Sequence, residues 1–306
     1  MSKDNWQKYK NGNVTVFINL DDGTKIRTCP DNEEYHPEFP ENADVTISTY
    51  CTHRCDFCYA GCSQFGSHAD LLSYKTLFDS LRPNTELAVN INSELNPQFV
   101  GFLTYMRDKG VIVNATLRQD DFERNHRQIE EWGELKLLRG IGISLLDPTD
   151  KFIELVKKNS NYVVHTIAGI TTMEQYNALA DNGLKILILG YKKTRRGQLY
   201  YDWNWSNVNA RIKELKTHLS DLMGRFRVIS FDNMAIEQLD FRSVLTPKEF
   251  EEFYMGEEGS FTMAIDLVNG TYASSSTSDV LYQLDKNQTI DEIFKTIQEE
   301  IHRDAE

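Results

Sequence analysis

The sequence lacks the features of a membrane protein and of a general nucleic-acid binder. Its longest apolar runs, such as Val111–Val113 and Ile186–Leu189, are far shorter than the roughly 20 residues that span a bilayer. Lysine and arginine number 33 against 46 aspartates and glutamates, and the formal net charge of -13 opposes broad capture of anionic polymers or membranes. The first residues carry no apolar signal core. We therefore expect a soluble, cytoplasmic protein.

Cysteine is also scarce, and its distribution is uneven. Four of the five cysteines, Cys51, Cys55, Cys58 and Cys62, lie close together, and none follows them. A disulfide framework would spread its cysteines along the chain to join distant elements. The clustering therefore predicts a metal site, with Cys29 outside it as a small hydrophobic residue.

From Asp44 onward the sequence alternates short β-rich runs with longer amphipathic segments. The expected strands are Val45–Thr49, Leu87–Ile91, Ile112–Leu117, Gly140–Leu145, Tyr162–Ile167 and Lys185–Leu189. The expected helices are Leu71–Leu81, Gln98–Lys109, Asp121–Trp132, Asp150–Lys158, Met173–Asn182 and Asn207–Met223. Strict alternation predicts parallel βαβ units in an α/β fold. Six such units favour a partial (β/α)6 TIM-like barrel over an open sheet, although periodicity alone does not separate the two.

The two ends of the chain depart from this alternation. Near the N-terminus, Val14–Ile18 and Thr24–Thr28 predict a β-hairpin, followed by a proline-containing linker. The expected C-terminal elements are strands Phe226–Phe231, Phe261–Leu267 and Thr271–Ala273 and helix Ile290–Ile301. We predict three parts: a hairpin and linker (1–43), the partial barrel (44–223) and an α+β extension (224–306) that covers the open side of the barrel.

The clustered cysteines directly follow the first strand of the alternating series. In an α/β barrel, active sites form at the carboxyl ends of the strands. The spacing of Cys51, Cys55 and Cys58 allows one loop to hold a cubane cluster with three thiolates, which leaves one iron without a protein ligand. An iron with an open position can bind a further molecule and react with it.

This loop, Cys51-Thr-His-Arg-Cys55-Asp-Phe-Cys58-Tyr59, resembles the signature of the radical S-adenosylmethionine (radical SAM) superfamily, in a member with a single cluster. The resemblance covers about 44–192. It implies that Cys51, Cys55 and Cys58 bind a [4Fe–4S] cluster, which reductively cleaves S-adenosylmethionine to a 5′-deoxyadenosyl radical for hydrogen abstraction. It also implies that Phe57 packs near the cluster and the adenine, with Tyr59 close by. A flavodoxin- or ferredoxin-like protein would be the electron donor.

Further cofactor contacts follow from the same resemblance. The family usually has a Gly-Gly-Glu-Pro-like turn after the second strand, whereas this chain has Asn92, Ser93 and Glu94. The glycines are missing, so side chains here could bind the methionine moiety, but the close backbone approach that glycine permits is not guaranteed. The later strands add candidates at their carboxyl ends. These candidates are Thr116, Ser144, expected at the ribose, Ile170, expected at the adenine, and His165.

The substrate and the catalytic residues are not identified by the sequence. The absence of cysteine after Cys62 favours a small or nucleotide-like substrate over a peptide, because peptide-modifying relatives often carry additional cysteine clusters. The basic stretch 192–197 could bind a substrate phosphate or carboxylate, or it could be a solvated loop.

A second function class remains open. All four clustered cysteines, with Cys62 as the fourth ligand, could form a closed zinc or iron–sulfur site. The protein would then be a non-catalytic metal-binding scaffold or interaction protein.

Overall fold

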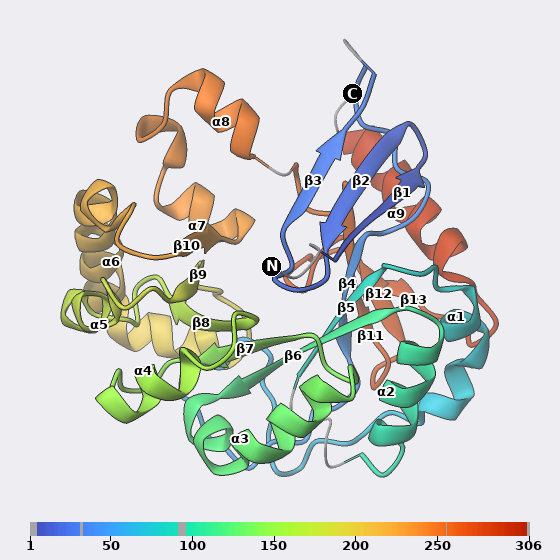
Figure 1. Cartoon of the computed structure of the whole chain (residues 1–306), viewed down its shortest axis with the longest axis horizontal. Coiled ribbons are helices and arrows are strands. Elements are labelled where there is room, and N and C mark those ends of the chain that lie inside the picture. The colour runs from blue at the N-terminus through green and yellow to red at the C-terminus, as the bar shows by residue number, and fades with distance from the viewer. Residues whose placement is uncertain (1–4, 31–32, 91–95, 255, 305–306) are drawn as a thin grey trace.

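A computed structural model describes residues 5–30, 33–90, 96–254 and 256–304. Its main feature is a sheet of ten strands in the order β10-β9-β8-β7-β6-β5-β4-β11-β12-β13 (Figure 1). The strands are β4 (Asn42–Thr46), β5 (Glu86–Asn90), β6 (Ile112–Arg118), β7 (Gly140–Ser144), β8 (Tyr162–Ile167), β9 (Lys185–Leu189), β10 (Val228–Phe231), β11 (Thr262–Asp266), β12 (Thr271–Ala273) and β13 (Tyr282–Gln283). Strands β4 to β11 pair in parallel, and β12 and β13 are antiparallel.

Helices connect successive parallel strands and lie around the outside of the sheet (Figure 1). They are η1 (Leu71–Tyr74), α1 (Lys75–Ser80), α2 (Phe99–Asp108), α3 (Gln119–Glu134), α4 (Asp150–Val156), α5 (Met173–Leu179), α6 (Arg196–Leu222), α7 (Asn233–Gln238), η3 (Phe241–Ser243), α8 (Pro247–Phe253) and α9 (Ile290–Asp304). Thr149 caps α4, and Thr172 forms a capping box with Gln175 at α5. None of the described helices is long and apolar enough to cross a membrane.

The predicted α/β class is confirmed, with a large parallel sheet at its centre. Along β5, β8 and β9, buried residues alternate with partly exposed ones, so one face of the sheet packs against the helices and the other is partly accessible. Within the described part of the chain, β10 and β13 are the end strands of the sheet and do not pair with each other. The partial barrel and the three-part division of the chain stay predictions.

Helix α6 starts well before its expected start at Asn207. The structure begins the helix at Arg196, with a non-helical residue at Asn204 where two helices meet at a kink. The prediction therefore found only the second of these two helices. The first contains Trp203, whose side chain is 87% exposed, so it shows no amphipathic pattern of the kind that identifies a surface helix.

The N-terminal hairpin is in fact a three-stranded antiparallel sheet of β1 (Trp6–Asn11), β2 (Val14–Asn19) and β3 (Lys25–Thr28). The prediction missed β1. Its residues are exposed except for the partly buried Tyr9 and the buried Asn11, so it lacks the alternation of apolar and polar side chains that identifies a strand.

A buried ion network fixes this small sheet to the large one. Glu41, whose side chain is fully buried, lies 3.3 Å from the ammonium of Lys25 and 3.0 Å from the guanidinium of Arg27. Lys25 also lies 2.8 Å from Glu86, the first residue of β5. The contacts place the small sheet at the amino ends of the parallel strands, opposite the end that carries the cysteines.

Candidate active site

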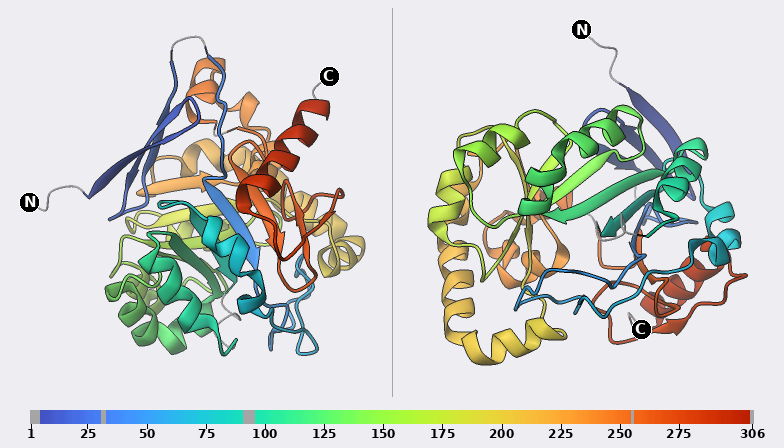
Figure 2. Two further views of the ribbon diagram at one scale, coloured as in Figure 1. Left: turned by 90° about the vertical axis from the view of Figure 1, so that its right-hand side faces the viewer. Right: turned by 90° about the horizontal axis from the view of Figure 1, so that it is seen from below.

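The cysteine loop follows β4 at the carboxyl end of that strand, as predicted. The loop folds back on itself, because the backbone N–H of Cys51 donates to the carbonyl of Ser63 at 2.9 Å, and that of Ser63 donates to Thr49 at 3.1 Å. Figure 2 shows the loop, in blue, running between α6 in yellow and the C-terminal segment in red. The loop is therefore held by elements that are far away in the sequence.

Cys58 is prepared to act as a ligand. The hydrogen bond from the Cys62 thiol, followed by those from the backbone N–H groups of Cys62 and Gly61 and by the charge of Arg196, lowers the pKa of Cys58 to about 5 against the effect of burial. The same contact raises the pKa of Cys62. The lowered pKa favours the thiolate, the form of cysteine that binds metals. Cys62, the possible fourth ligand of a closed site, contacts Cys58 directly.

Cys55 has a cationic neighbour on the third parallel strand. An Nη of Arg118, at the end of β6, lies 3.9 Å from the Cys55 sulfur, and Arg118 also pairs with Asp120 through a 2.7 Å hydrogen bond. Burial raises the pKa of Cys55, while Arg118 lowers it and the charges of Cys58 and Cys51 raise it further. The three cysteines of the motif therefore interact electrostatically.

A second contact joins the loop to the start of α3. The Nε2 of His53 lies 2.5 Å from a carboxylate oxygen of Asp121. His53, Asp120 and Asp121 present ligand atoms within 4.8 Å of one another, a spacing that could suit a metal ion. However, Asp120 pairs with Arg118, and Asp121 pairs with Arg124 at 2.9 Å. Since both carboxylates already have cationic partners, this group is better suited to positioning the loop.

The basic stretch after β9 also binds the cysteine loop. Arg196 donates to the carbonyls of Cys55 at 3.1 Å and Cys62 at 2.9 Å, and Arg195 donates to the carbonyl of Ala60. The sequence led us to expect either an anion site or a solvated loop here. It did not indicate that the arginines hold the cysteine loop through its carbonyl groups. The pairing is not encoded locally, because the loop and the arginines lie more than a hundred positions apart in the chain.

Lys192 lies beside the cysteine loop, next to the accessible face of the sheet. Its ammonium lies 4.5 Å from the ring centroid of Tyr59, 3.3 Å from the hydroxyl of Ser276 and 4.0 Å from Asp232. Burial opposes the charge of Lys192, but Tyr59, Asp232 and Asp44 hold its pKa above the ordinary range. Asp44, an exposed residue of β4, also lies close enough for its charge to act on Lys192. These groups form a polar cluster beside the loop.

The expected cofactor residues are only partly brought together. Thr116 and Ser144 lie on the accessible face of the sheet, where Ser144 pairs in register with Arg118 and with His165. Tyr59 lies under Lys192, as described above, and Phe57 instead packs edge-on against Tyr200, with ring centroids 6.0 Å apart. The carbonyl of Ile170, another expected contact, accepts a hydrogen bond from Arg211 at 2.8 Å. The expected contacts Asn92, Ser93 and Glu94 lie outside the described residues.

His165 lies flat against a glycine on the neighbouring strand. A side chain at Gly142 would meet the imidazole, since its Cβ would fall 2.2 Å from Cε1 of His165. Burial lowers the pKa of His165 from its ordinary value of 6.5 to about 4. The imidazole is therefore neutral at physiological pH.

This lowered pKa makes stability depend on pH. Below pH 6.5 the unfolded chain protonates this histidine while the folded chain does not, so stability falls as the pH falls toward 4. Between pH 7 and pH 5, we expect the wild type to lose about 2 kcal/mol more than His165→Gln, which lacks this proton. Urea denaturation at both pH values measures the difference. Equal losses in the two proteins would contradict a neutral, partly buried imidazole.

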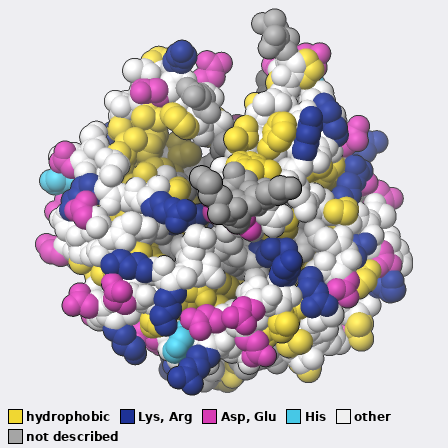
Figure 3. Space-filling view, in the orientation of Figure 1, with side chains coloured by type: hydrophobic (Ala, Val, Ile, Leu, Met, Phe, Trp, Pro, Cys, Tyr) yellow, Lys and Arg dark blue, Asp and Glu magenta, His cyan; other side chains and the backbone are white. Residues whose placement is uncertain are grey.

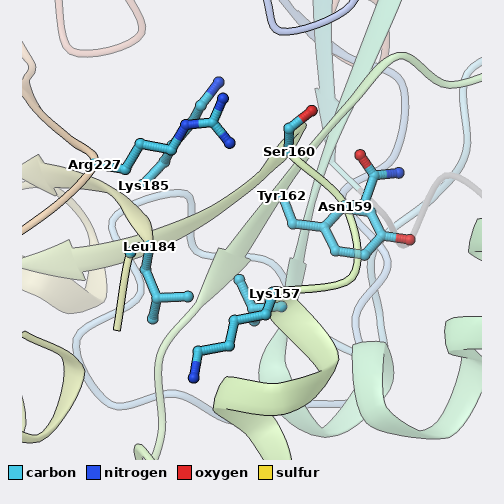
Figure 4. Close-up of a pocket in the computed structure, with 9 residues that line it drawn as sticks. Lys157, Asn159, Ser160, Tyr162, Leu184, Lys185 and Arg227 are labelled. Carbon is cyan, nitrogen blue, oxygen red and sulfur yellow. The ribbon is translucent and has the colours of Figure 1, made fainter. Parts of the chain in front are cut away.

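A small basic pocket of about 160 Å³ lies at the amino ends of the parallel strands, opposite the end that carries the cysteine loop. It is lined by residues at the start of β8 and β9. Figure 4 shows Lys185 and Arg227 side by side in its lining. The ammonium of Lys185 donates to the carbonyl of Asp22 at 2.8 Å, and Ser160 donates to that of Asp21 at 3.3 Å. The pocket therefore borders the turn between β2 and β3 and helps to dock the small sheet.

Comparisons with known proteins give a structural likeness. No protein-family model matches the chain, and no curated protein sequence matches it. The crystal structure of Streptococcus suis SuiB bound to S-adenosylmethionine aligns with a TM-score of 0.58 at 11% identity, over 95% of this chain and 87% of that chain. A crystal structure described only as Streptococcus suis SuiB aligns with a TM-score of 0.54, at the same identity and coverage. What is shared is the fold. The α/β architecture of this chain is like that of SuiB.

Proposed function

We propose that this chain is a radical SAM enzyme in which Cys51, Cys55 and Cys58 hold a [4Fe–4S] cluster. The observation that carries the proposal is the cysteine loop itself, which follows β4 and in which a guanidinium nitrogen of Arg118 lies 3.9 Å from the Cys55 sulfur. That loop stands at the carboxyl end of a strand in a parallel sheet, beside a face that the helices do not cover. The donor set fits an iron–sulfur cluster, because thiolates are its protein ligands. The likeness of the fold to SAM-bound SuiB adds support.

When bound, the cluster supplies an electron that cleaves S-adenosylmethionine to a 5′-deoxyadenosyl radical, which abstracts hydrogen from the substrate. The chain's own residues would orient the reactants. In the proposed partial barrel, Thr116 and Ser144 offer hydroxyl groups to S-adenosylmethionine from the accessible face. Arg195 and Arg196 fix the loop through its carbonyls, so the cysteines keep their positions during electron transfer. A flavodoxin- or ferredoxin-like protein is the proposed donor.

Electron paramagnetic resonance tests this proposal. The anaerobically reconstituted and reduced chain should give a [4Fe–4S]⁺ signal that shifts when S-adenosylmethionine is added, and 5′-deoxyadenosine should accumulate. A shift requires an iron that S-adenosylmethionine can reach. A cluster signal that is indifferent to S-adenosylmethionine would contradict the proposal.

One observation favours a second candidate function. Because Cys62 hydrogen-bonds to Cys58, a fourth cysteine is at hand to close the site if it loses its proton to a metal. A closed zinc or iron–sulfur site would stabilise the loop without catalysis, as in a metal-binding scaffold. Metal analysis separates the candidates, since zinc near one per chain supports the scaffold. Iron with inorganic sulfide is common to the enzyme and a closed cluster, which the response to S-adenosylmethionine then distinguishes.

Arg118 should set the reduction potential of the proposed cluster. Its guanidinium approaches the Cys55 sulfur, and a positive donor to a ligand sulfur stabilises the reduced, more negative cluster. Arg118→Gln should therefore lower the midpoint potential, by on the order of 50 mV. A redox titration followed by electron paramagnetic resonance measures this shift.

Arg124→Gln is the matched control for that titration. Arg124 pairs with Asp121 at 2.9 Å, and its side chain is 63% exposed. It belongs to the same segment of the chain as Arg118, but no described contact joins it to a cysteine. Equal potentials in the Arg118 variant and this control would show that the guanidinium does not act on the cluster.

A further inference from the structure

A cavity of about 460 Å³ lies between α7 and α8, next to the end of β10. Figure 3 shows hydrophobic side chains gathered on the part of the surface that carries these helices. Asn233 lines the cavity and directly follows Asp232, whose carboxylate approaches Lys192 at 4.0 Å. Since Lys192 covers the ring of Tyr59, the cavity adjoins the polar cluster beside the cysteine loop.

The walls of this cavity are strongly acidic. They carry four carboxylates and one guanidinium; the carboxylates are Glu237, Asp240, Glu257 and Glu258. Asp240 pairs with Lys216 at 2.8 Å, and Glu257 accepts a hydrogen bond from Tyr254. Within the described part of the chain, Glu237 and Glu258 have no ion-pair partner. The charge of Glu258 also acts on Lys192 and Asp44, so it reaches the accessible face of the sheet.

The other walls are aromatic. The rings of Phe250 and Tyr254 are stacked, with centroids 4.9 Å apart and an angle of 24° between planes. The guanidinium carbon of Arg242 lies 4.1 Å from the centroid of Phe250, so this wall already binds one planar cation. Aromatic faces attract cations electrostatically, and they also pack against the aliphatic chain that carries such a group.

We infer that this cavity binds an organic cation, an ammonium or guanidinium group on an aliphatic chain, as the substrate or the part of the substrate that the enzyme recognises. The inference rests on the proposed function for its link to catalysis. Glu258 and Glu237 receive the charge, and the chain lies along Phe250 and Tyr254. The volume is in the range of pockets for small organic ligands. A nucleotide phosphate is disfavoured, because it would meet unpaired carboxylates.

Calorimetric titration of agmatine into the full-length, anaerobically reconstituted chain tests this inference. Agmatine carries an ammonium and a guanidinium on a short aliphatic chain, and hexanoate serves as a probe of opposite charge. We expect agmatine to bind and hexanoate not to bind. Glu258→Gln should weaken agmatine binding about tenfold, because one unpaired carboxylate is lost. Added sodium chloride should also weaken binding in the wild type.

Glu251→Gln is the matched control, because Glu251 is an exposed residue of α8 outside the lining of the cavity. It should bind agmatine like the wild type. A second arm uses an arginine-containing peptide with blocked termini, and tighter binding of this peptide would identify a polypeptide as the source of the cation. Weaker binding would identify a free amine.

Two results would overturn the inference: no agmatine binding by the wild type, or equal binding by wild type, Glu258→Gln and Glu237→Gln. If a variant fails to fold, two measurements on the wild type still test whether the cavity binds an organic cation: the salt dependence of agmatine binding and the comparison with hexanoate. Cleavage of S-adenosylmethionine is measured separately. If the protein cleaves S-adenosylmethionine but does not bind agmatine, only this inference is contradicted. If it binds agmatine but does not cleave S-adenosylmethionine, only the proposed function is contradicted.

Discussion

Cys58→Ala should reduce S-adenosylmethionine cleavage to the level of the cluster-free protein, whereas Cys62→Ala should retain the iron–sulfur signal and its response to S-adenosylmethionine. The hydrogen bond from Cys62 lowers the pKa of Cys58, and removing Cys58 leaves a cubane with too few protein ligands. Iron and sulfide content, the electron paramagnetic resonance spectrum and 5′-deoxyadenosine formation together measure the effect.

Cys62→Ala makes the comparison decisive, because Cys62 hydrogen-bonds to Cys58 in the structure. If Cys62 only donates this bond, the cluster persists without it and one iron stays open. Loss of the cluster in both variants would instead identify a closed site with four thiolates. The enzyme proposal would then fail, and the scaffold would be the better description.

Glu41→Ala should be the most destabilising of the substitutions considered outside the cysteine loop. The side chain is fully buried between Lys25 and Arg27. Removing one partner of a buried ion pair leaves charge in a low-dielectric environment, which costs about 3 to 5 kcal/mol. Chemical denaturation monitored by circular dichroism gives the free energy of unfolding.

Glu154→Ala is the control for the same measurement. Glu154 pairs with Lys157 at 2.8 Å, but its side chain is 70% exposed. Exposed pairs contribute about 0 to 1 kcal/mol, so its loss should be small. Similar values for the two variants would mean that the network around Glu41 does not hold the two sheets together.

The sequence predicted the elements with a strong period and missed those without one. The strand predicted at Lys185–Leu189 has the bounds of β9, and that at Tyr162–Ile167 has the bounds of β8, because β-branched and apolar runs are bounded there by turn residues. β1 was missed, since a strand with one buried residue depends on pairing with β2 and not on its own pattern.

The candidate site shows the same division. Local sequence pattern predicted that the cysteines Cys51, Cys55 and Cys58 follow a strand, and in the structure they follow β4. The contacts of Arg118 and Arg196 with the loop are tertiary, and nothing in the neighbouring residues indicates them. The basic stretch 192–197 in an acidic chain was the available signal, but the sequence did not indicate that it contacts the cysteine loop.

The strand that carries the cysteine loop obtains its second neighbour late in synthesis. β4 pairs in parallel with β5 and with β11, which lies more than two hundred positions further along the chain. Until β11 emerges from the ribosome, β4 is an edge strand with unsatisfied backbone groups. Pairing over such a separation closes a long loop and is slow to form. Assembly of the site therefore has to wait until β11 has been translated.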